Sequence, residues 1–183
     1  MTFDQLVTKW QSPIGEWAIS KGWTTQERDP DHPDKMRNVP RDMLCLLMLM
    51  VTELAELEAG LQNEDDANIR EEVADFAIRA IQMRAEYGFT CKTESTLSQL
   101  VEGIKGGESL YAMVAAAAES WRLKTVSAAT KEVLVWNHLA ICIAVAATDN
   151  ADDGARTLLW LDEAIAAKMK VNALRAHMHG KLA

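Results

Sequence analysis

The distribution of proline is the sequence feature that most restricts how this chain can fold. The four prolines all lie in the first 40 residues, at Pro13, Pro30, Pro33 and Pro40. Proline lacks a backbone donor and clashes with the preceding helical turn, so a long proline-free stretch rich in apolar residues favours helices. Residues 41–183 form such a stretch. We therefore predict an all-α helical bundle in a single domain spanning residues 1–183.

Caps and breakers set the expected helix boundaries in the first half of the chain. An amphipathic segment over 3–11 should be interrupted by Pro13 and Gly15, restart over 16–21 and end at Gly22. Residues 24–40 are expected to form a polar loop. A long helix is predicted over 41–61, and a second over 68–87, with Asn68 as its N-cap, Glu71 in the capping-box position and Gly88 as its stop.

The second half, residues 90–183, is also expected to be helical. Helices are predicted over 109–124 and 130–148, and a last one from the Asp152–Asp153 cap toward His177. Because Glu119 and Glu132 align with Glu53 and Glu72, the pair 109–148 raises the hypothesis of a degenerate second hairpin. No acid corresponds to Asp75, and any two apolar hairpins share this pattern.

Composition excludes several classes of function. A formal net charge of −8 argues against a broad nucleic-acid surface, which needs clustered Lys and Arg. The longest apolar run, Met43 to Val51, has nine residues, whereas a membrane span needs about 20. The three cysteines, Cys45, Cys91 and Cys142, are far apart and are expected to be small core residues. With an acid near the N-terminus and no signal-like apolar segment, we expect a cytoplasmic protein without a membrane partner.

Four carboxylates occur at a spacing that should bring them together. Glu53 and Glu56 are three residues apart in the first long helix, and Glu72 and Asp75 are three apart in the second. An i, i+3 pair lies on one helical face. Glu53 and Asp75 are equally far from residue 64, and so are Glu56 and Glu72. Residue 64 falls in the predicted turn, and antiparallel helices rise equally from that turn. The four side chains should therefore converge.

Converging carboxylates repel one another, and their burial without compensation is unfavourable. An oxygen-only donor set suits Mg²⁺, with Mn²⁺ as an alternative, better than zinc or copper. The neighbouring run from Met43 to Val51, apolar on every side, indicates a buried location. The competing interpretation is that these acids are solvated and that Asp75 pairs with Arg79 at i+4. Glu58 and Glu71 fall off the shared face and are expected to be solvated.

The pattern Glu53-x-x-Glu56, fifteen intervening residues and Glu72-x-x-Asp75 resembles the signature of the all-α nucleoside triphosphate pyrophosphohydrolase superfamily. This superfamily includes MazG-like proteins and dimeric dUTPases. The MazG-like branch is similar over Leu46 to Gly88, including Glu71 to Asp75 and Ile78-Arg79, and at Lys21-Gly22-Trp23. The resemblance covers residues 16–88 and part of the last helix, whereas 90–150 departs from the short members.

The resemblance implies Mg²⁺ at the four acids and cleavage between the α and β phosphates of (deoxy)nucleoside triphosphates, a nucleotide-pool house-cleaning activity. Which nucleobase is preferred stays open. A carboxylate-bridged di-iron bundle is a competing enzyme class. Such bundles bind iron through Glu-x-x-His pairs, and neither of the predicted helices over 41–61 and 68–87 contains histidine. A non-catalytic acidic helical binding module is the second alternative. Six tryptophans and leftover apolar faces favour a homodimer.

Cationic and aromatic residues supply candidates for substrate binding. Lys168, Asn172 and Arg175 follow i, i+4 and i+7 spacing and share one face of the last helix. They are expected to bind triphosphate oxygens, although a basic helix end can also simply complement the helix dipole. Lys21 and Trp23 are further candidates, with Trp23 stacking on a base or packing in the core. The other tryptophans, Trp10, Trp17, Trp121, Trp136 and Trp160, are expected in the core or at an interface.

Overall fold

The computed structural model describes residues 1, 3–39, 42–87, 118–119, 122 and 154–176. The described elements are α1 (Phe3–Ser20), β1 (Thr25–Arg28), β2 (Met36–Val39), α2 (Met43–Gln62), α3 (Asp66–Tyr87) and α7 (Gly154–Leu174). Apart from one small two-stranded sheet, this part of the chain is helical, so the all-α prediction is confirmed. The predicted helices over 109–124 and 130–148, with the hypothesis of a second hairpin, lie outside the described residues except for helical residues 118, 119 and 122.

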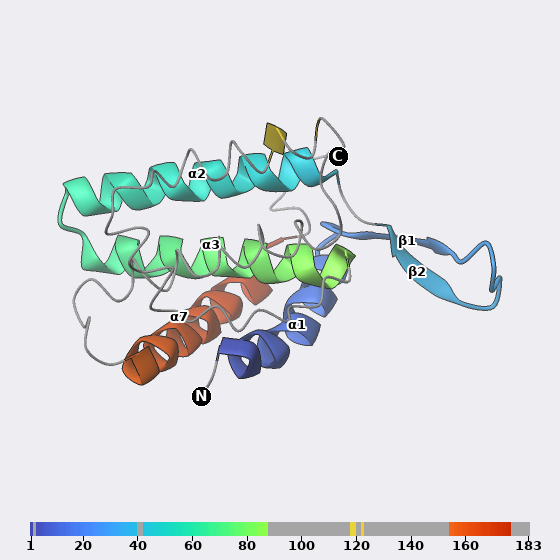
Figure 1. The fold of residues 1–183 in the computed structure, drawn as a ribbon, viewed down its shortest axis with the longest axis horizontal. Coiled ribbons are helices and arrows are strands. Elements are labelled where there is room, and N and C mark those ends of the chain that lie inside the picture. Colours follow the sequence, from blue (N-terminus) through green and yellow to red (C-terminus); the bar gives the residue numbers. More distant parts are fainter. Residues whose placement is uncertain (2, 40–41, 88–117, 120–121, 123–153, 177–183) are drawn as a thin grey trace.

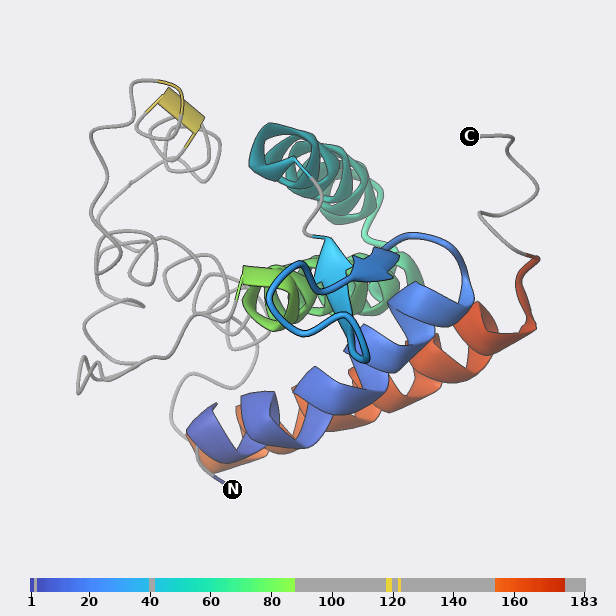
Figure 2. The same cartoon turned by 90° about the vertical axis from the view of Figure 1, so that its right-hand side faces the viewer.

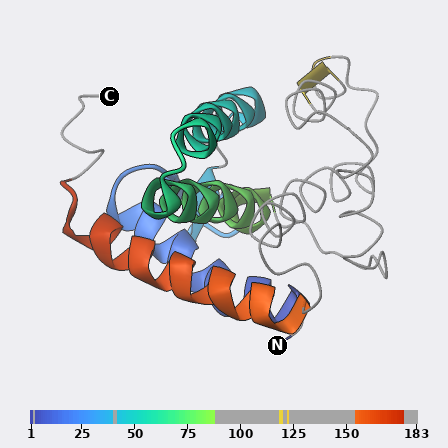
Figure 3. The same ribbon diagram turned by 90° about the vertical axis from the view of Figure 1, so that its left-hand side faces the viewer.

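Helix α3 lies at the centre of the described bundle. It packs against α1, α2 and α7, and α1 and α7 run side by side along its other flank (Figure 1, Figure 2). Figure 3 shows α7 and α1 below the α2–α3 hairpin from the opposite end. The core is formed by buried apolar side chains of α1, α2, α3 and α7, of which the largest are Phe76, Leu6, Ile14, Leu46, Met50, Ile78, Ile81, Leu161 and Ile165.

Helix α1 is continuous, and the predicted interruption at Pro13 and Gly15 is wrong. Pro13 lies inside the helix but on its exposed side, where water can satisfy the Lys9 carbonyl that lacks an i+4 donor. The predicted end at Gly22 is confirmed. Gly22 has φ of 74°, its N–H donates to Ile19 O, and the N–H of Trp23 donates to Ala18 O at 2.8 Å. These two backbone hydrogen bonds together form a Schellman motif.

The α2–α3 hairpin turns at residues 63–65, as the symmetry of the acids about residue 64 predicts. Asp42 caps α2 by accepting from the Leu44 N–H. The predicted cap of α3 is wrong: the helix starts at Asp66, and Asp65 accepts from the N–H of Asn68 at 3.1 Å. The Asn68 side chain instead donates to the Glu56 carbonyl at 3.3 Å, which ties the two helices together near the turn.

Residues 24–40 are not an irregular loop as predicted, since β1 and β2 form an antiparallel hairpin within them. The register pairs Thr25 with Val39 and Glu27 with Arg37, and these last two side chains form an ion pair across the strands. All four residues of β1 are exposed, and the hairpin projects from the bundle at the end where α3 finishes (Figure 1).

The apolar run at the start of α2 is buried on one face only. Leu46, Leu47 and Met50 lie in the core, whereas Met48 is 61% exposed, so the expectation of burial on every side is wrong. Cys45 is exposed too, contrary to its predicted place in the core, and Cys91 and Cys142 lie outside the described residues. None of the helices described here is long and apolar enough to cross a membrane.

Candidate metal site between α2 and α3

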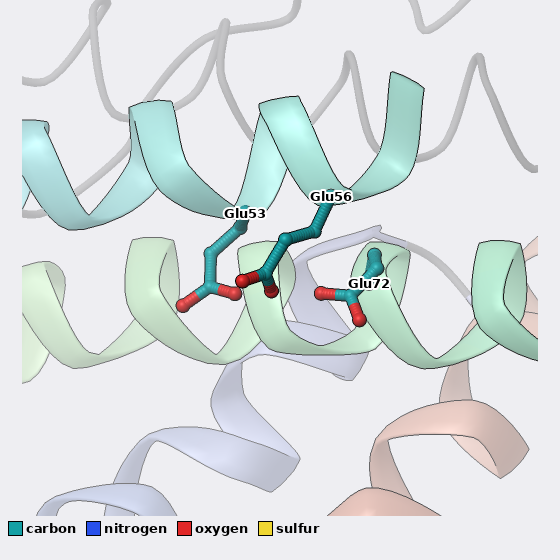
Figure 4. A group of neighbouring side chains, drawn as sticks. All are labelled: Glu53, Glu56 and Glu72. Atoms are coloured by element: carbon teal, nitrogen blue, oxygen red, sulfur yellow. The ribbon is translucent and has the colours of Figure 1, made fainter. Parts of the chain in front are cut away.

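Three of the four predicted acids converge between α2 and α3. Each of Glu53, Glu56 and Glu72 offers a carboxylate oxygen, and these oxygens all lie within 4.8 Å of one another. Figure 4 shows Glu53 and Glu56 descending from α2 toward Glu72 on α3. Glu53 and Glu72 are buried and Glu56 is exposed, so the cluster lies at the edge of the interface. The hairpin register explains the convergence, because both helices rise equally from the turn.

Burial and repulsion perturb the two buried glutamates. The pKa of Glu72 is raised to about 8, first by burial and then by its hydrogen bond with Glu56 and the charges of Glu56, Asp75 and Glu53. One oxygen of Glu72, Oε2, is buried without a hydrogen-bond partner among the described residues. Burial also raises the pKa of Glu53, and the nearby Arg79 opposes that rise. The cluster therefore has spare oxygen ligands, and its environment disfavours negative charge unless a proton or a cation compensates it.

Arg79 supplies a positive charge to this cluster. Its Nε donates to Glu53 Oε1 at 3.1 Å, and both side chains are largely buried. The competing prediction, that Arg79 pairs with Asp75, is wrong. The Arg79 guanidinium also lies 5.9 Å from the centre of the Trp23 ring, a cation–π distance. The contact with Glu53 was not predicted from the sequence, although Arg79 follows Glu72 by seven residues and so shares its helical face.

Asp75 lies beside the three glutamates but faces Lys168 of α7. The Lys168 Nζ is 2.7 Å from Asp75 Oδ2 and also contacts Glu71, which is exposed as predicted. Burial lowers the pKa of Lys168, but the hydrogen bonds with Asp75 and Glu71 outweigh this effect, and the pKa is raised. The fourth acid is thus neutralised by a lysine, while its charge still raises the pKa values of Glu72 and Glu53.

The other residues of the predicted cationic face lie farther along α7. Asn172 is 2% exposed, and its Oδ1 has no hydrogen-bond partner in the described part of the chain. Arg175 follows the last helical residue and is partly exposed. Lys21 donates to the carbonyls of Ala173 at 2.9 Å and Arg175 at 2.6 Å, so it caps the C-terminal end of α7. Such a contact is favourable because the last carbonyls of a helix lack internal donors.

An open groove of about 170 Å³ lies between α3 and α7 next to Lys168. Its lining combines small apolar side chains with the charged Arg70, Glu71 and Lys168. The predicted phosphate-binding lysine therefore lies at a boundary between the acid cluster and a groove.

The tryptophans that the structure describes pack in or against the core. Trp17 is 7% exposed and donates to the Asn172 carbonyl at 3.3 Å, and Trp10 donates to Asp162 at 2.8 Å. Trp160 contacts Arg70, and Trp23 is partly buried against the core beside Arg79. The remaining two, Trp121 and Trp136, lie outside the described residues.

Comparisons of the chain with protein-family models, curated proteins and solved structures gave no significant match.

Proposed function

We propose that this protein hydrolyses (deoxy)nucleoside triphosphates to monophosphate and pyrophosphate with Mg²⁺, or Mn²⁺ in its place. The observation that carries the proposal is the convergence of Glu53, Glu56 and Glu72 within 4.8 Å at the interface of two helices. Evenly spaced acids on an antiparallel hairpin place hard oxygen ligands in one small volume. The same residues carry the resemblance to the all-α pyrophosphohydrolases.

The residues present fit a hard divalent cation. They offer only oxygen donors, and the buried Oε2 of Glu72 has no partner among the described residues, so it is available as a ligand. When bound, Mg²⁺ would neutralise phosphate charge and lower the pKa of a bound water. Glu53, Glu56 and Glu72 would hold the ion, and Asp75 would join them by leaving Lys168.

The surrounding side chains have roles that follow from their contacts. Arg79 holds the Glu53 carboxylate in place through the 3.1 Å bond. Lys168, when released from both Asp75 and Glu71, would be free to bind a phosphate oxygen, with Asn172 and Arg175 farther along the same face of α7. Lys21 was a candidate for direct substrate contact, but its bonds to two α7 carbonyls support a positioning role for this helix.

The reaction itself needs an aligned water and neutralised charge more than covalent help from the protein. One carboxylate of the cluster would accept a hydrogen bond from the water and orient it toward the α-phosphorus. The oxygen of that water would join the monophosphate, and the bond from the α-phosphorus to the bridging oxygen would break and release pyrophosphate. The proposal also includes assembly of this protein into a homodimer.

Product analysis tests the function. Nucleoside and deoxynucleoside triphosphates would be incubated with the wild type in Mg²⁺ or in EDTA, together with Glu72→Ala and with Glu58→Gln, which changes an exposed acid on α2. Monophosphate with pyrophosphate, lost in EDTA and in Glu72→Ala but kept in Glu58→Gln, is the expected result. Turnover of no nucleotide by the folded wild type would refute the proposal and favour the binding module.

A further inference from the structure

Lys168 lies where the metal site and a groove meet. On one side its Nζ is 2.7 Å from Asp75 Oδ2, and Asp75 is the one predicted metal ligand outside the converging group of three acids. On the other side Lys168 lines the open groove between α3 and α7, together with Arg70 and Glu71. A movement of this one side chain would therefore change both the metal site and the groove.

The two carboxylates that bind Lys168 differ in their exposure to water. The side chain of Asp75 is 16% exposed and that of Lys168 is 5% exposed, so water screens their ion pair only weakly. The side chain of Glu71 is 48% exposed and lies at the groove, where water competes for the contact. The ion pair with Asp75 is therefore the main constraint on the lysine, and the contact with Glu71 is the weaker one.

Asp75 is close enough to the three glutamates to join them around an ion. It lies three residues after Glu72 on the same helical face, and its charge raises the pKa of both Glu72 and Glu53. A divalent ion beside Glu72 carries twice the charge of the lysine ammonium, so at a similar distance it attracts the Asp75 carboxylate more strongly. A divalent cation and Lys168 therefore compete for the same carboxylate.

We infer that Lys168 couples the metal site to the groove between α3 and α7. It binds Asp75 in the metal-free protein, and it turns toward the groove once a divalent cation binds Asp75. Without the metal, two carboxylates occupy the lysine, so the groove does not offer this ammonium group to an anion. With the metal bound, only the exposed Glu71 contact remains, and a phosphate group can replace it.

The coupling sets an order of binding. The metal binds first and releases Lys168, and an anionic group then binds at the groove. Because coupling between two sites is reciprocal, an anion that binds Lys168 also leaves Asp75 free for the metal, and each ligand strengthens the binding of the other by the same factor. This inference rests on the metal site of the proposed function, and it adds the regulation of that site.

Acetylation of Lys168 in the full chain tests the coupling without turnover. The wild type would be treated briefly with an amine-acetylating reagent in EDTA or in saturating Mg²⁺. Peptide mass spectrometry would then give the acetylation of Lys168 relative to Lys170, an exposed lysine of the same helix. This ratio should rise about fivefold with Mg²⁺, as expected for coupling between two sites. A lysine that only stabilises the fold should not become more reactive, because metal binding stabilises the folded state.

Two variants separate the release of the lysine from a simple loss of charge. In Asp75→Asn the acetylation ratio in EDTA should already equal that of the wild type in Mg²⁺ and should not respond to the metal. In Lys168→Met, titration calorimetry should show about fivefold tighter binding of Mn²⁺, because the metal no longer competes with the lysine for Asp75. Arg70 lines the same groove but pairs with Glu163, so Arg70→Met should bind Mn²⁺ as the wild type does.

The outcomes distinguish this inference from the proposed function. Bound Mg²⁺ with an unchanged or lower acetylation ratio would overturn the inference and leave the proposed function standing, and so would an unchanged Mn²⁺ affinity in folded Lys168→Met. Binding of no divalent metal would overturn both. A ratio that rises with Mg²⁺ while no triphosphate is hydrolysed would support the coupling and refute the function. The acetylation measurement uses the unchanged protein, so it decides the inference even if Lys168→Met does not fold.

Discussion

Replacing Glu72 with glutamine should stabilise the metal-free protein at alkaline pH and leave it nearly unchanged near pH 5. Glu72 is 7% exposed, and its pKa is raised to about 8. Between the ordinary carboxyl pKa and this value, the folded protein keeps a proton that the unfolded chain has released. Rising pH therefore lowers the free energy of unfolding across this window. Glutamine has no charge to desolvate and removes the dependence.

The size of the effect follows from proton linkage. One proton bound only in the folded state changes the free energy of unfolding by at most about 1.4 kcal/mol per pH unit. Glu72 forms a hydrogen bond with the exposed Glu56, and nearby solvent screens the cluster, so we expect a total of about 2 kcal/mol. For a chain of this length the difference in Tm at pH 8 is about 4–8 °C.

Thermal unfolding followed by circular dichroism from pH 5 to 8.5 in EDTA measures this difference. The wild type should lose stability relative to Glu72→Gln as pH rises, and Glu58→Gln should behave as the wild type. Adding Mg²⁺ should reverse the order at high pH, because carboxylates bind metal when deprotonated and binding stabilises the folded state. Parallel curves for the wild type and Glu72→Gln in EDTA would refute the reasoning.

Two further variants test the contacts that build the site. Lys168→Met leaves the carboxylates of Asp75 and Glu71 without their cation and should lower the free energy of unfolding in EDTA by about 2 kcal/mol. Urea denaturation measures this loss, and Lys170→Met, a change at an exposed position of the same helix, should leave the stability nearly unchanged. Gly60→Val should cost about 1–3 kcal/mol, because a Cβ at Gly60 would lie 3.2 Å from the Ile69 side chain at the α2–α3 contact. Ala59→Val introduces the same β-branched residue at an exposed position, so an equal loss there would contradict the packing argument.

The convergence of Glu53, Glu56 and Glu72 could be predicted because it depends on local geometry. Helical rise and the position of the turn fix which residues of a hairpin lie level, and both can be read from the sequence. The partner of Asp75 could not be predicted in this way. Lys168 belongs to a distant helix, and the face of α7 that meets α3 is determined by packing of the whole core. The pairing of Arg79 with Glu53, in contrast, lies within the α2–α3 hairpin, so the same local geometry could have indicated it.

The hairpin over 25–39 shows a second limit. Its strands carry charged residues such as Glu27 and Arg37 and lack the alternation of apolar and polar residues that indicates a strand. Pro13 shows a third limit of prediction from the sequence, since a proline is tolerated inside α1 where the helix faces solvent. For Pro13 the solvent exposure of that side of α1, which the local pattern does not encode, decided the structure.

The position of bond cleavage is the most direct test of the central claim. Each deoxynucleoside triphosphate would be incubated with the protein and Mg²⁺ in water labelled with heavy oxygen, and the products would be analysed by mass spectrometry. Attack at the α-phosphorus predicts label in the monophosphate and unlabelled pyrophosphate, with no products in EDTA or with Glu72→Ala. Label in inorganic phosphate beside a diphosphate, or no turnover by the folded protein, would contradict it.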